Sequence, residues 1–201
     1  QVLVATGSPF APVEYKGKSP EHREWQNLRV TEETARAFFS SRPRNVGVIL
    51  GAVSGGLVDI DLDCPEARAL AGRFLPSTGS VFGRSSAKRS HWLYYSDGCQ
   101  YRAFQDPCKP QAAECSVTLL EIRSDGHQTV FPGSVHKSGE RITWATDDGP
   151  ETVAADDLYA ACAKLAAASL LARHWPSQGS RQDTAMALSG GERRRVEIAR
   201  C

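Results

Sequence analysis

The amino-acid sequence predicts a single domain of the α/β or α+β class, and three observations support this prediction. The chain has 201 residues and 41% hydrophobic content, which is enough for the core of about one domain. Several short apolar runs alternate with period two or end at glycine, and these runs indicate strands. A few other segments carry capping residues and helical spacing. The mixture of strands with few helices, without internal repeats, favours a mixed fold.

The first fifty residues predict one helix and one strand after an irregular start. Residues 1–30 are polar and contain several prolines, so no regular element is expected there. A helix is expected over residues 32–40, because Thr31 can cap it and acidic residues fill its first turn. The apolar run at 46–50 ends at Gly51 and is typical of a buried strand.

Residues 57–62 predict a strand with one apolar face and one acidic face. The acidic face carries Asp59, Asp61 and Asp63. Adjacent like charges repel, so a partly buried face of this kind needs compensation. Oxygen ligands on a rigid strand favour Mg²⁺ or Mn²⁺ over zinc as the compensating ion. In the alternative interpretation, Asp63 caps the next helix and the other two aspartates face water. The strand alone leaves both interpretations open.

The middle of the chain predicts a helix, two strands and an insertion. The segment 64–75 is expected to be helical, with a proline in the first turn where it is tolerated. Strands are expected at 80–83 and at 91–95, which begins with His91 and continues as WLYY. Residues 96–115 contain three cysteines and two prolines and are expected to form a surface insertion.

The last third of the predicted domain contains strands followed by a long helix. Residues 117–123 are expected to form an apolar strand. The next segment, GHQTVFPGSVH, is expected to continue as a strand into a turn, and SGERITW to close a hairpin-like unit. Residues 156–175 predict one amphipathic helix that is capped by one of its two opening aspartates.

Basic and hydroxyl side chains gather just before the strand that opens with His91. The segment GRSSAKRSH contains a permissive glycine, and its side chains can cradle phosphate oxygens. His91 can donate to a phosphate or sugar oxygen. The alternative is a surface loop with a half-buried histidine. The candidate contacts in the segment are Arg84, Ser86, Lys88 and Ser90.

Glu121 is a single carboxylate in the otherwise apolar run LLEIR. Burying it without a partner costs several kcal/mol, so a partner is expected. On an alternating strand Arg123 points the same way, and a salt bridge between the two is one interpretation. The other is that Glu121 is a third metal ligand beside the acidic strand. His127 and His136 follow on either side of the next turn.

Composition excludes some classes of protein and leaves others open. The formal net charge is +1, which neither indicates nor excludes nucleic-acid binding. No apolar run approaches ~20 residues, so no transmembrane helix or membrane partner is expected. The first ten residues do not resemble a signal peptide, and the absence of an initial Met suggests a piece of a longer chain. A cytoplasmic location is expected, because six scattered cysteines do not suggest a disulfide framework.

Three cysteines in the expected insertion leave two interpretations open. Cys99, Cys108 and Cys115 could bind zinc, but their spacing departs from that of zinc fingers and no fourth ligand is evident. The alternative is an exposed loop with free thiols.

The order of these motifs resembles the bifunctional primase-polymerase domain of the archaeo-eukaryotic primase superfamily. The resemblance runs from about Lys18 to Arg181 and includes NVGVILG and SGGLVDIDLD. The acidic pair of the family falls on Asp61 and Asp63. Asp59 falls where the family more often has an apolar residue, so the resemblance places it behind the metal ligands.

Two further motifs carry the resemblance. The second motif of the family is a small residue, any residue, and then a histidine before an aromatic strand. His91 with WLYY matches it, although Arg89 replaces the small residue and Ser90 is adjacent. The third motif is an acid after an apolar run, and Glu121 in LLEIRSDGHQTVFPGSVH matches it. The specificity lies in the three motifs together and in this order.

The resemblance implies a palm-like sheet of the RNA-recognition-motif type that holds the active site, and a small N-terminal α/β lobe. It implies that Asp61, Asp63 and Glu121 hold two Mg²⁺ or Mn²⁺ ions, and that the partners are a DNA template, a primer and a dNTP or NTP. It also implies a role in replicating a plasmid, phage or other mobile element. The residues expected at the incoming nucleotide are Arg84, Ser86, Lys88, Ser90, His91, Arg123 and His127.

The C-terminal segment predicts a separate piece. We expect a catalytic domain over residues 1–176 and a helical tail over 177–201, the start of a downstream helicase or helical domain. The tail sequence LSGGERRRVEIAR resembles the signature segment of ABC-transporter ATPases, but the chain lacks the GxxxxGK[ST] phosphate loop that would accompany it. A metal-dependent nuclease and an inactive nucleic-acid-binding module are the alternatives to a polymerase.

Overall fold

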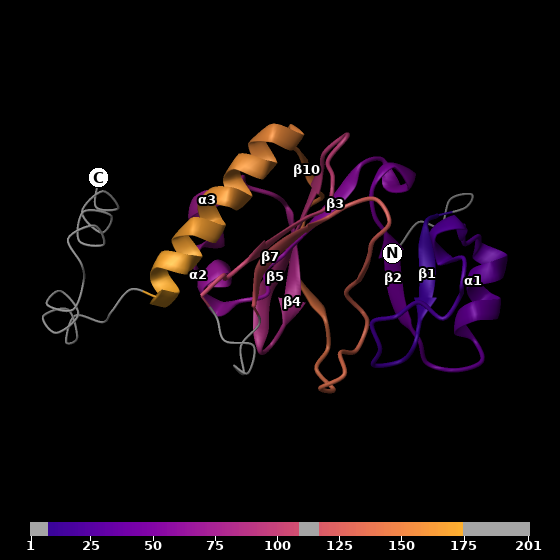
Figure 1. Cartoon of the computed structure of the whole chain (residues 1–201). Coiled ribbons are helices and arrows are strands. Elements are labelled where there is room, and N and C mark those ends of the chain that lie inside the picture. The colour runs from indigo at the N-terminus through magenta and orange to yellow at the C-terminus, as the bar shows by residue number, and fades with distance from the viewer. Residues whose placement is uncertain (1–7, 109–116, 175–201) are drawn as a thin grey trace, which may run out of the picture.

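A computed structural model describes residues 8–108 and 117–174 and shows a mixed α and β architecture. The helices are α1 (Glu32–Phe39), α2 (Pro65–Phe74) and α3 (Ala155–His174), with short 3-10 turns at Trp25–Asn27 and Ala52–Ser54. The strands are β1 (Phe10–Val13), β2 (Asn45–Ile49), β3 (Leu57–Asp61), β4 (Ser80–Arg84), β5 (Ala87–Tyr95), β6 (Arg102–Gln105), β7 (Thr118–Arg123), β8 (Gln128–Val130), β9 (Thr143–Asp147) and β10 (Glu151–Thr152). Figure 1 shows α2 and α3 beside the large sheet, and α1 with β1 and β2 at the other end of the molecule.

The large sheet has the order β6-β7-β3-β5-β4-β9, and all these neighbours are antiparallel. Strand β10 adds to β5 in parallel. The acidic strand β3 is therefore central, with β7 on one side and β5 on the other. In this register Asp61 lies opposite both Glu121 and His91, and Asp59 lies opposite Arg123. Because directly opposed residues share a face, the sheet gathers these side chains on one surface.

The opposite face of the large sheet is apolar and packs under the helices. Alternation along β3 turns Val58 and Ile60 to this face, where they join the main hydrophobic cluster. Small residues of α2, such as Ala67 and Ala71, let the helix approach the sheet closely. From α3, Leu158, Leu165 and their buried neighbours fill the same cluster. This core supports the strands from behind. The acidic face carries a second, smaller cluster, in which Leu57, Phe82 and Leu93 lie with Val48 and Leu50 from β2 and the residue after it.

The small sheet has the order β1-β2-β8. The expectation that residues 1–30 hold no regular element is wrong at β1, which is a strand because its backbone pairs with β2. The expected hairpin-like unit after β7 is confirmed around its turn, but the flanking strands do not pair with each other: β8 pairs with β2 in the small sheet and β9 with β4 in the large one. An antiparallel bridge between Val135 and Arg141 closes the intervening loop, and backbone hydrogen bonds from Gly133 to Ile142 and from His136 to Glu140 flank it. Long-range partners decide strand pairing here, and local alternation does not encode them. The segment 131–142 consequently crosses between the two sheets.

The helix predictions are confirmed apart from the caps of the second and third helices. Helix α1 begins after Thr31, whose side chain forms a capping box with Thr34. Helix α2 is capped by the Cys64 sulfur, which accepts from the Ala67 amide, so the interpretation of Asp63 as the cap is wrong. Helix α3 begins at Ala155, so the two aspartates expected as caps lie in its first turn, where their charges interact favourably with the helix dipole.

The expected surface insertion at 96–115 is only partly correct. Cys99 is buried in the main core, and residues 102–105 form β6 at the edge of the large sheet. Cys108 is exposed, and Cys115 lies outside the described residues. Among the residues that the structure describes, no Cys or His cluster with zinc-binding geometry is present. The long helical tail expected over 177–201 also lies outside the described residues.

Within residues 8–108 and 117–174, no helix combines the length and the apolar character needed to cross a membrane.

Candidate active site

Three carboxylates converge at the end of the central strand. Asp61 ends β3, Asp63 follows it, and Glu121 lies directly opposite Asp61 on β7. One oxygen of each lies within 4.8 Å of the others, and this is the cluster of the described region whose geometry could hold a metal ion. The set consists of oxygen donors alone, which suits a hard divalent cation. The sequence-predicted ligands are thus brought together by strand register.

Arg123 forms salt bridges with two of these carboxylates. Its Nη2 lies 2.5 Å from Asp61 Oδ2 and 2.8 Å from Glu121 Oε2. Burial lowers the pKa of Arg123, but Asp61, Asp59 and Glu121 outweigh it, so its pKa is above the usual range. The salt bridge and the metal site, which the sequence left as alternatives for Glu121, therefore use the same carboxylates.

Asp63 shows that Arg123 does not neutralise the cluster. Burial, the Asp61 charge and the Glu121 charge raise the pKa of Asp63 from 3.8 to about 6, although Arg123 and Lys18 act in the opposite direction. Burial is the largest cause of this rise, and the Asp61 charge adds to it more than the Arg123 charge opposes it. A buried group of oxygen donors of this kind fits a bound divalent cation.

Asp59 lies behind the three carboxylates and holds the histidine of the second motif. It is fully buried, and its Oδ2 lies 3.0 Å from His91 Nδ1. Burial lowers the pKa of His91, but the charges of Asp61 and Asp59 outweigh it, so the pKa of His91 is raised. The other oxygen, Asp59 Oδ1, has no hydrogen-bond partner among the described residues. Asp59 therefore orients His91 and favours its charged form.

The ring of His91 is also fixed from the neighbouring strand. Phe82 lies opposite it on β4 and stacks on it, with ring centroids 4.6 Å apart and planes 12° apart. The strand pair bulges just before this point, and Arg89 takes a left-handed backbone with φ 53°. Gly83 makes room for the bulge, because a Cβ there would meet the Ala87 carbonyl oxygen at 2.3 Å. The position that the family fills with a small residue is thus the strained residue of a bulge.

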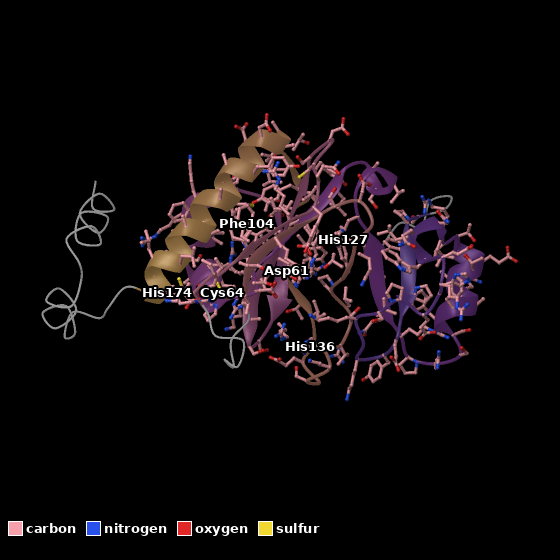
Figure 2. The ribbon with its side chains drawn as sticks, viewed as in Figure 1. Asp61, Cys64, Phe104, His127, His136 and His174 are labelled. Atoms are coloured by element: carbon pink, nitrogen blue, oxygen red, sulfur yellow. The ribbon has the colours of Figure 1, made fainter. Side chains whose placement is uncertain are left out.

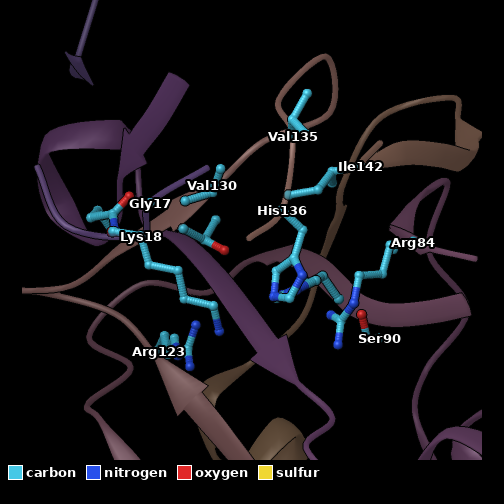
Figure 3. Close-up of a pocket in the computed structure, with 13 residues that line it drawn as sticks. Gly17, Lys18, Arg84, Ser90, Arg123, Val130, Val135, His136 and Ile142 are labelled. Carbon is cyan, nitrogen blue, oxygen red and sulfur yellow. The ribbon is translucent and has the colours of Figure 1, made fainter. Parts of the chain in front are cut away.

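A cavity of about 230 Å³ adjoins the carboxylates, and Arg123 and His91 form part of its wall. Figure 3 shows Lys18, Arg84 and His136 extending their polar ends toward the same space as Arg123. Burial and the nearby charges of Arg84 and Lys18 lower the pKa of His136. The walls therefore present several cationic groups that suit an anionic ligand.

Three residues of the cavity wall carry buried polar atoms without hydrogen-bond partners among the described residues. The buried Ser90 Oγ and Thr129 Oγ1 and the Gln128 Oε1 have no hydrogen-bond partner within the described parts of the chain, and all three residues line the cavity. Buried polar atoms without partners cost free energy, and they commonly mark positions that a ligand satisfies.

The comparison with known families agrees with this geometry. The model of the family described as bifunctional DNA primase/polymerase, N-terminal, matches residues 1–159. The chain belongs to this family. The family implies primase/polymerase nucleotidyltransferase activity, with nucleic acid and nucleotides as substrates. No curated protein matches the chain.

Four of the residues that the sequence assigned to the nucleotide line the cavity of this primase/polymerase domain: Arg84, Ser90, His91 and Arg123. Three others do not. Ser86 instead donates from its amide and hydroxyl to Glu140, at 2.7 and 2.8 Å. Lys88 is exposed, and His127 stacks against Tyr101.

Ser86 has a structural role that the sequence did not indicate. Its hydrogen bonds and those of Ser138 lower the pKa of Glu140 to about 2. Arg84 adds an ion pair to Glu140 at 3.3 Å. These contacts dock the loop that carries His136 onto the β4–β5 turn. Ser86 therefore supports the cavity wall without lining it.

Sequence reasoning did not assign Lys18 or His136 to the site. Lys18 reaches the cavity because Gln128 Nε2 donates to its carbonyl oxygen at 2.7 Å. Gly47 leaves the space for that glutamine, since a Cβ there would meet Gln128 Oε1 at 2.4 Å. Asn45 ties Gly17 to Val135 across the rim through its side-chain amide. The only sequence signal for Lys18 was its place at the start of the family resemblance.

Proposed function

We propose that this domain is a template-directed nucleotidyltransferase that joins nucleoside triphosphates on DNA with two divalent ions. One observation carries the proposal: a three-carboxylate cluster adjoins a cationic cavity, and Arg123 belongs to both. Carboxylates for metals beside cations for phosphates are the two parts that phosphoryl transfer to a hydroxyl needs.

Asp61, Asp63 and Glu121 are the residues that would hold the ions, and their oxygen donors suit Mg²⁺ or Mn²⁺. When bound, such ions activate the attacking hydroxyl and neutralise charge on the phosphates. Burial and the neighbouring charges of Asp61 and Glu121 raise the pKa of Asp63, and a cation at this position would favour its ionised form. Asp59 would act from behind, through its contact with His91.

The cavity residues would bind and orient the triphosphate. His91, held charged by the aspartates, would donate to a phosphate oxygen. Lys18 and Arg84 would neutralise further phosphate charge from two sides of the cavity. His136 has a lowered pKa beside those cations, and an arriving anion would favour its protonation.

Arg123 would link the carboxylate cluster to the cationic cavity. A cation between Asp61 and Glu121 competes for the oxygens that Arg123 now contacts. Since Arg123 also lines the cavity, its guanidinium could transfer its hydrogen bonds to the triphosphate as the ions bind. Charge would thus stay balanced at each stage.

The sheet supports the palm-like assignment. The four strands that carry the site occur in the chain as β3, β4, β5 and β7, and they lie in the order β7-β3-β5-β4 with α2 after the first. A helix after the first strand and antiparallel pairing throughout are features of ferredoxin-like sheets, to which the RNA-recognition motif belongs. The roles in mobile-element replication and the downstream helicase segment are proposals from the resemblance alone.

Incorporation of a labelled dNTP or NTP on a primed DNA template, with Mg²⁺ or Mn²⁺, tests the proposal. The variant Asp61→Ala/Asp63→Ala should lose at least about 10³-fold in rate, equivalent to about 4 kcal/mol. The control Asp156→Ala/Asp157→Ala removes two exposed carboxylates from α3 and should retain activity. Wild-type incorporation by the first variant contradicts the proposal. Metal-dependent cleavage of the template without incorporation favours a nuclease instead.

A further inference from the structure

Tyr101 is an exposed aromatic residue in contact with the carboxylate cluster. It lies just before β6, and 43% of its surface is exposed. Its hydroxyl donates to Glu121 Oε1 at 3.0 Å. Its ring stacks on His127, with centroids 4.4 Å apart and planes 13° apart. A large ring held flat in this way, yet open to solvent, is a surface on which another ring can stack.

The Tyr101–His127 pair lies on the other side of Glu121 from the nucleotide cavity. Glu121 Oε1 accepts from Tyr101, whereas Oε2 accepts from Arg123, which lines the cavity. Neither Tyr101 nor His127 belongs to the cavity wall. In Figure 2 His127 lies above Asp61 and His136, a cavity residue, lies below it. The carboxylates thus separate an aromatic surface from a cationic cavity.

The geometry of phosphoryl transfer suggests a function for the surface formed by Tyr101 and His127. The attacking hydroxyl and the leaving pyrophosphate oxygen lie roughly in line, on opposite sides of the transferred phosphorus. If the triphosphate occupies the cationic cavity, the acceptor hydroxyl must approach the carboxylates from outside it. Aromatic side chains bind single nucleic-acid strands by stacking on bases, without sequence preference.

We propose that Tyr101 and His127 form a stacking platform for the terminal nucleotide of the acceptor strand. The placement rests on the proposed function, which puts the triphosphate in the cavity. His127, which the resemblance assigns to the incoming nucleotide, would instead support the primer end. The hydroxyl of Tyr101 would hold Glu121 in place while its ring receives the base.

Binding of a fluorescent primer–template without nucleotide tests the platform independently of turnover. The variant Tyr101→Ala should weaken binding about 10-fold, which corresponds to about 1.4 kcal/mol. His127→Ala removes the supporting ring and should weaken it about 3-fold. Tyr101→Phe keeps the ring and should retain wild-type affinity. The matched control is Tyr95→Ala, because Tyr95 is also exposed but lies at the far end of β5, opposite Leu57.

Steady-state incorporation adds the second measurement. In Tyr101→Ala the KM for primer–template should rise, and the KM for dNTP should change less than about 2-fold. A raised dNTP KM with unchanged DNA affinity overturns the proposal and assigns the pair to the incoming nucleotide. Unchanged values for both substrates in Tyr101→Ala and His127→Ala also overturn it, since the stack would then be only structural.

The two proposals fail in different ways. If the wild-type protein does not incorporate nucleotides but Tyr101→Ala still loses DNA affinity, the platform stands and the proposed activity falls. If the wild-type protein is active and neither ring variant affects the primer, the platform alone falls. Absence of primer–template binding by the wild-type protein contradicts the platform directly.

Discussion

Two clusters of charged residues in this domain contain the same residue types but differ in how far their acidic groups are paired. The active-site cluster contains Asp59, Asp61, Asp63 and Glu121 with Arg123 and His91. The helix-end cluster, where α3 ends against α2 and the residue after β6, contains Asp106 and Glu66 with Arg173 and His174. In each, an arginine bridges two carboxylates and a histidine contacts a fully buried aspartate.

The difference lies in how completely the acids are paired. In the helix-end cluster, burial raises the pKa of Asp106, but hydrogen bonds from His174 and Arg173 outweigh it and lower its pKa overall. In the active-site cluster the pKa of Asp63 is raised to about 6, and Asp59 Oδ1 lacks a partner within the described chain. A balanced cluster stabilises the fold, whereas an unbalanced one is suited to binding cations.

The largest expected effect comes from removing the arginine of the balanced cluster. Arg173→Met should lower the free energy of unfolding by about 3 kcal/mol, because the buried Asp106 carboxylate loses its guanidinium partner. Urea denaturation measures this loss, and activity of the folded protein should persist. Arg36→Met is the control, because its ion pair with Glu32 is exposed at 79% and 75% and should contribute less than about 1 kcal/mol. Equal losses in both variants would remove the distinction.

The same substitution in the unbalanced cluster should act on metal binding. Arg123→Met frees oxygens of Asp61 and Glu121 and removes a positive charge, so the Mn²⁺ affinity of the protein should rise about 10-fold, or about 1.4 kcal/mol. Calorimetric titration with Mn²⁺ measures it. Arg173→Met should leave this affinity unchanged. Weaker Mn²⁺ binding in Arg123→Met would show that the arginine orders the carboxylates and does not compete with the ion.

The fold was predictable where local chemistry decides it. Thr31 and the acidic turn after it correctly predicted α1, and period-two alternation correctly predicted β3 and its two faces. The pairing of β8 and β9 was not predictable, because each finds its partner in a different sheet far away in sequence. Residues 102–105 were missed as a strand, since an edge strand has exposed side chains and little apolar pattern.

The residues of the candidate site were likewise predictable only where a local sequence pattern indicates them. Asp61 and Asp63 lie within or next to a strand whose alternation is readable, and their spacing indicated a shared face. That His91 lies opposite Asp61 depends on strand pairing, which no local pattern indicated. Lys18 and His136 reach the cavity only through contacts between the two sheets, so no local pattern indicated their role. The sequence did not indicate a role for Tyr101, because that role depends on contacts with Glu121 and His127, which lie on other segments.

The smallest expected effect is the change in stability when one aspartate of each cluster is replaced by asparagine, and its sign should differ between the two clusters. Burial raises the pKa of Asp63 from 3.8 to about 6, so ionised Asp63 costs stability above about pH 6, and this cost disappears below about pH 4. Asp63→Asn should therefore raise the free energy of unfolding at pH 7.5 by about 1 kcal/mol, a value reduced for the partial solvent exposure of Asp63, and leave it unchanged near pH 4. Asp106 has a lowered pKa, so its contribution is present above its unfolded pKa and is lost as the pH falls. Asp106→Asn should accordingly destabilise the protein at pH 7.5. Urea denaturation of both variants with EDTA, at pH 7.5 and 4.5, compares the signs. Destabilisation by Asp63→Asn at pH 7.5 would mean that the folded protein already stabilises the ionised carboxylate. Asp63 would then be a structural charge and not a ligand that awaits a cation.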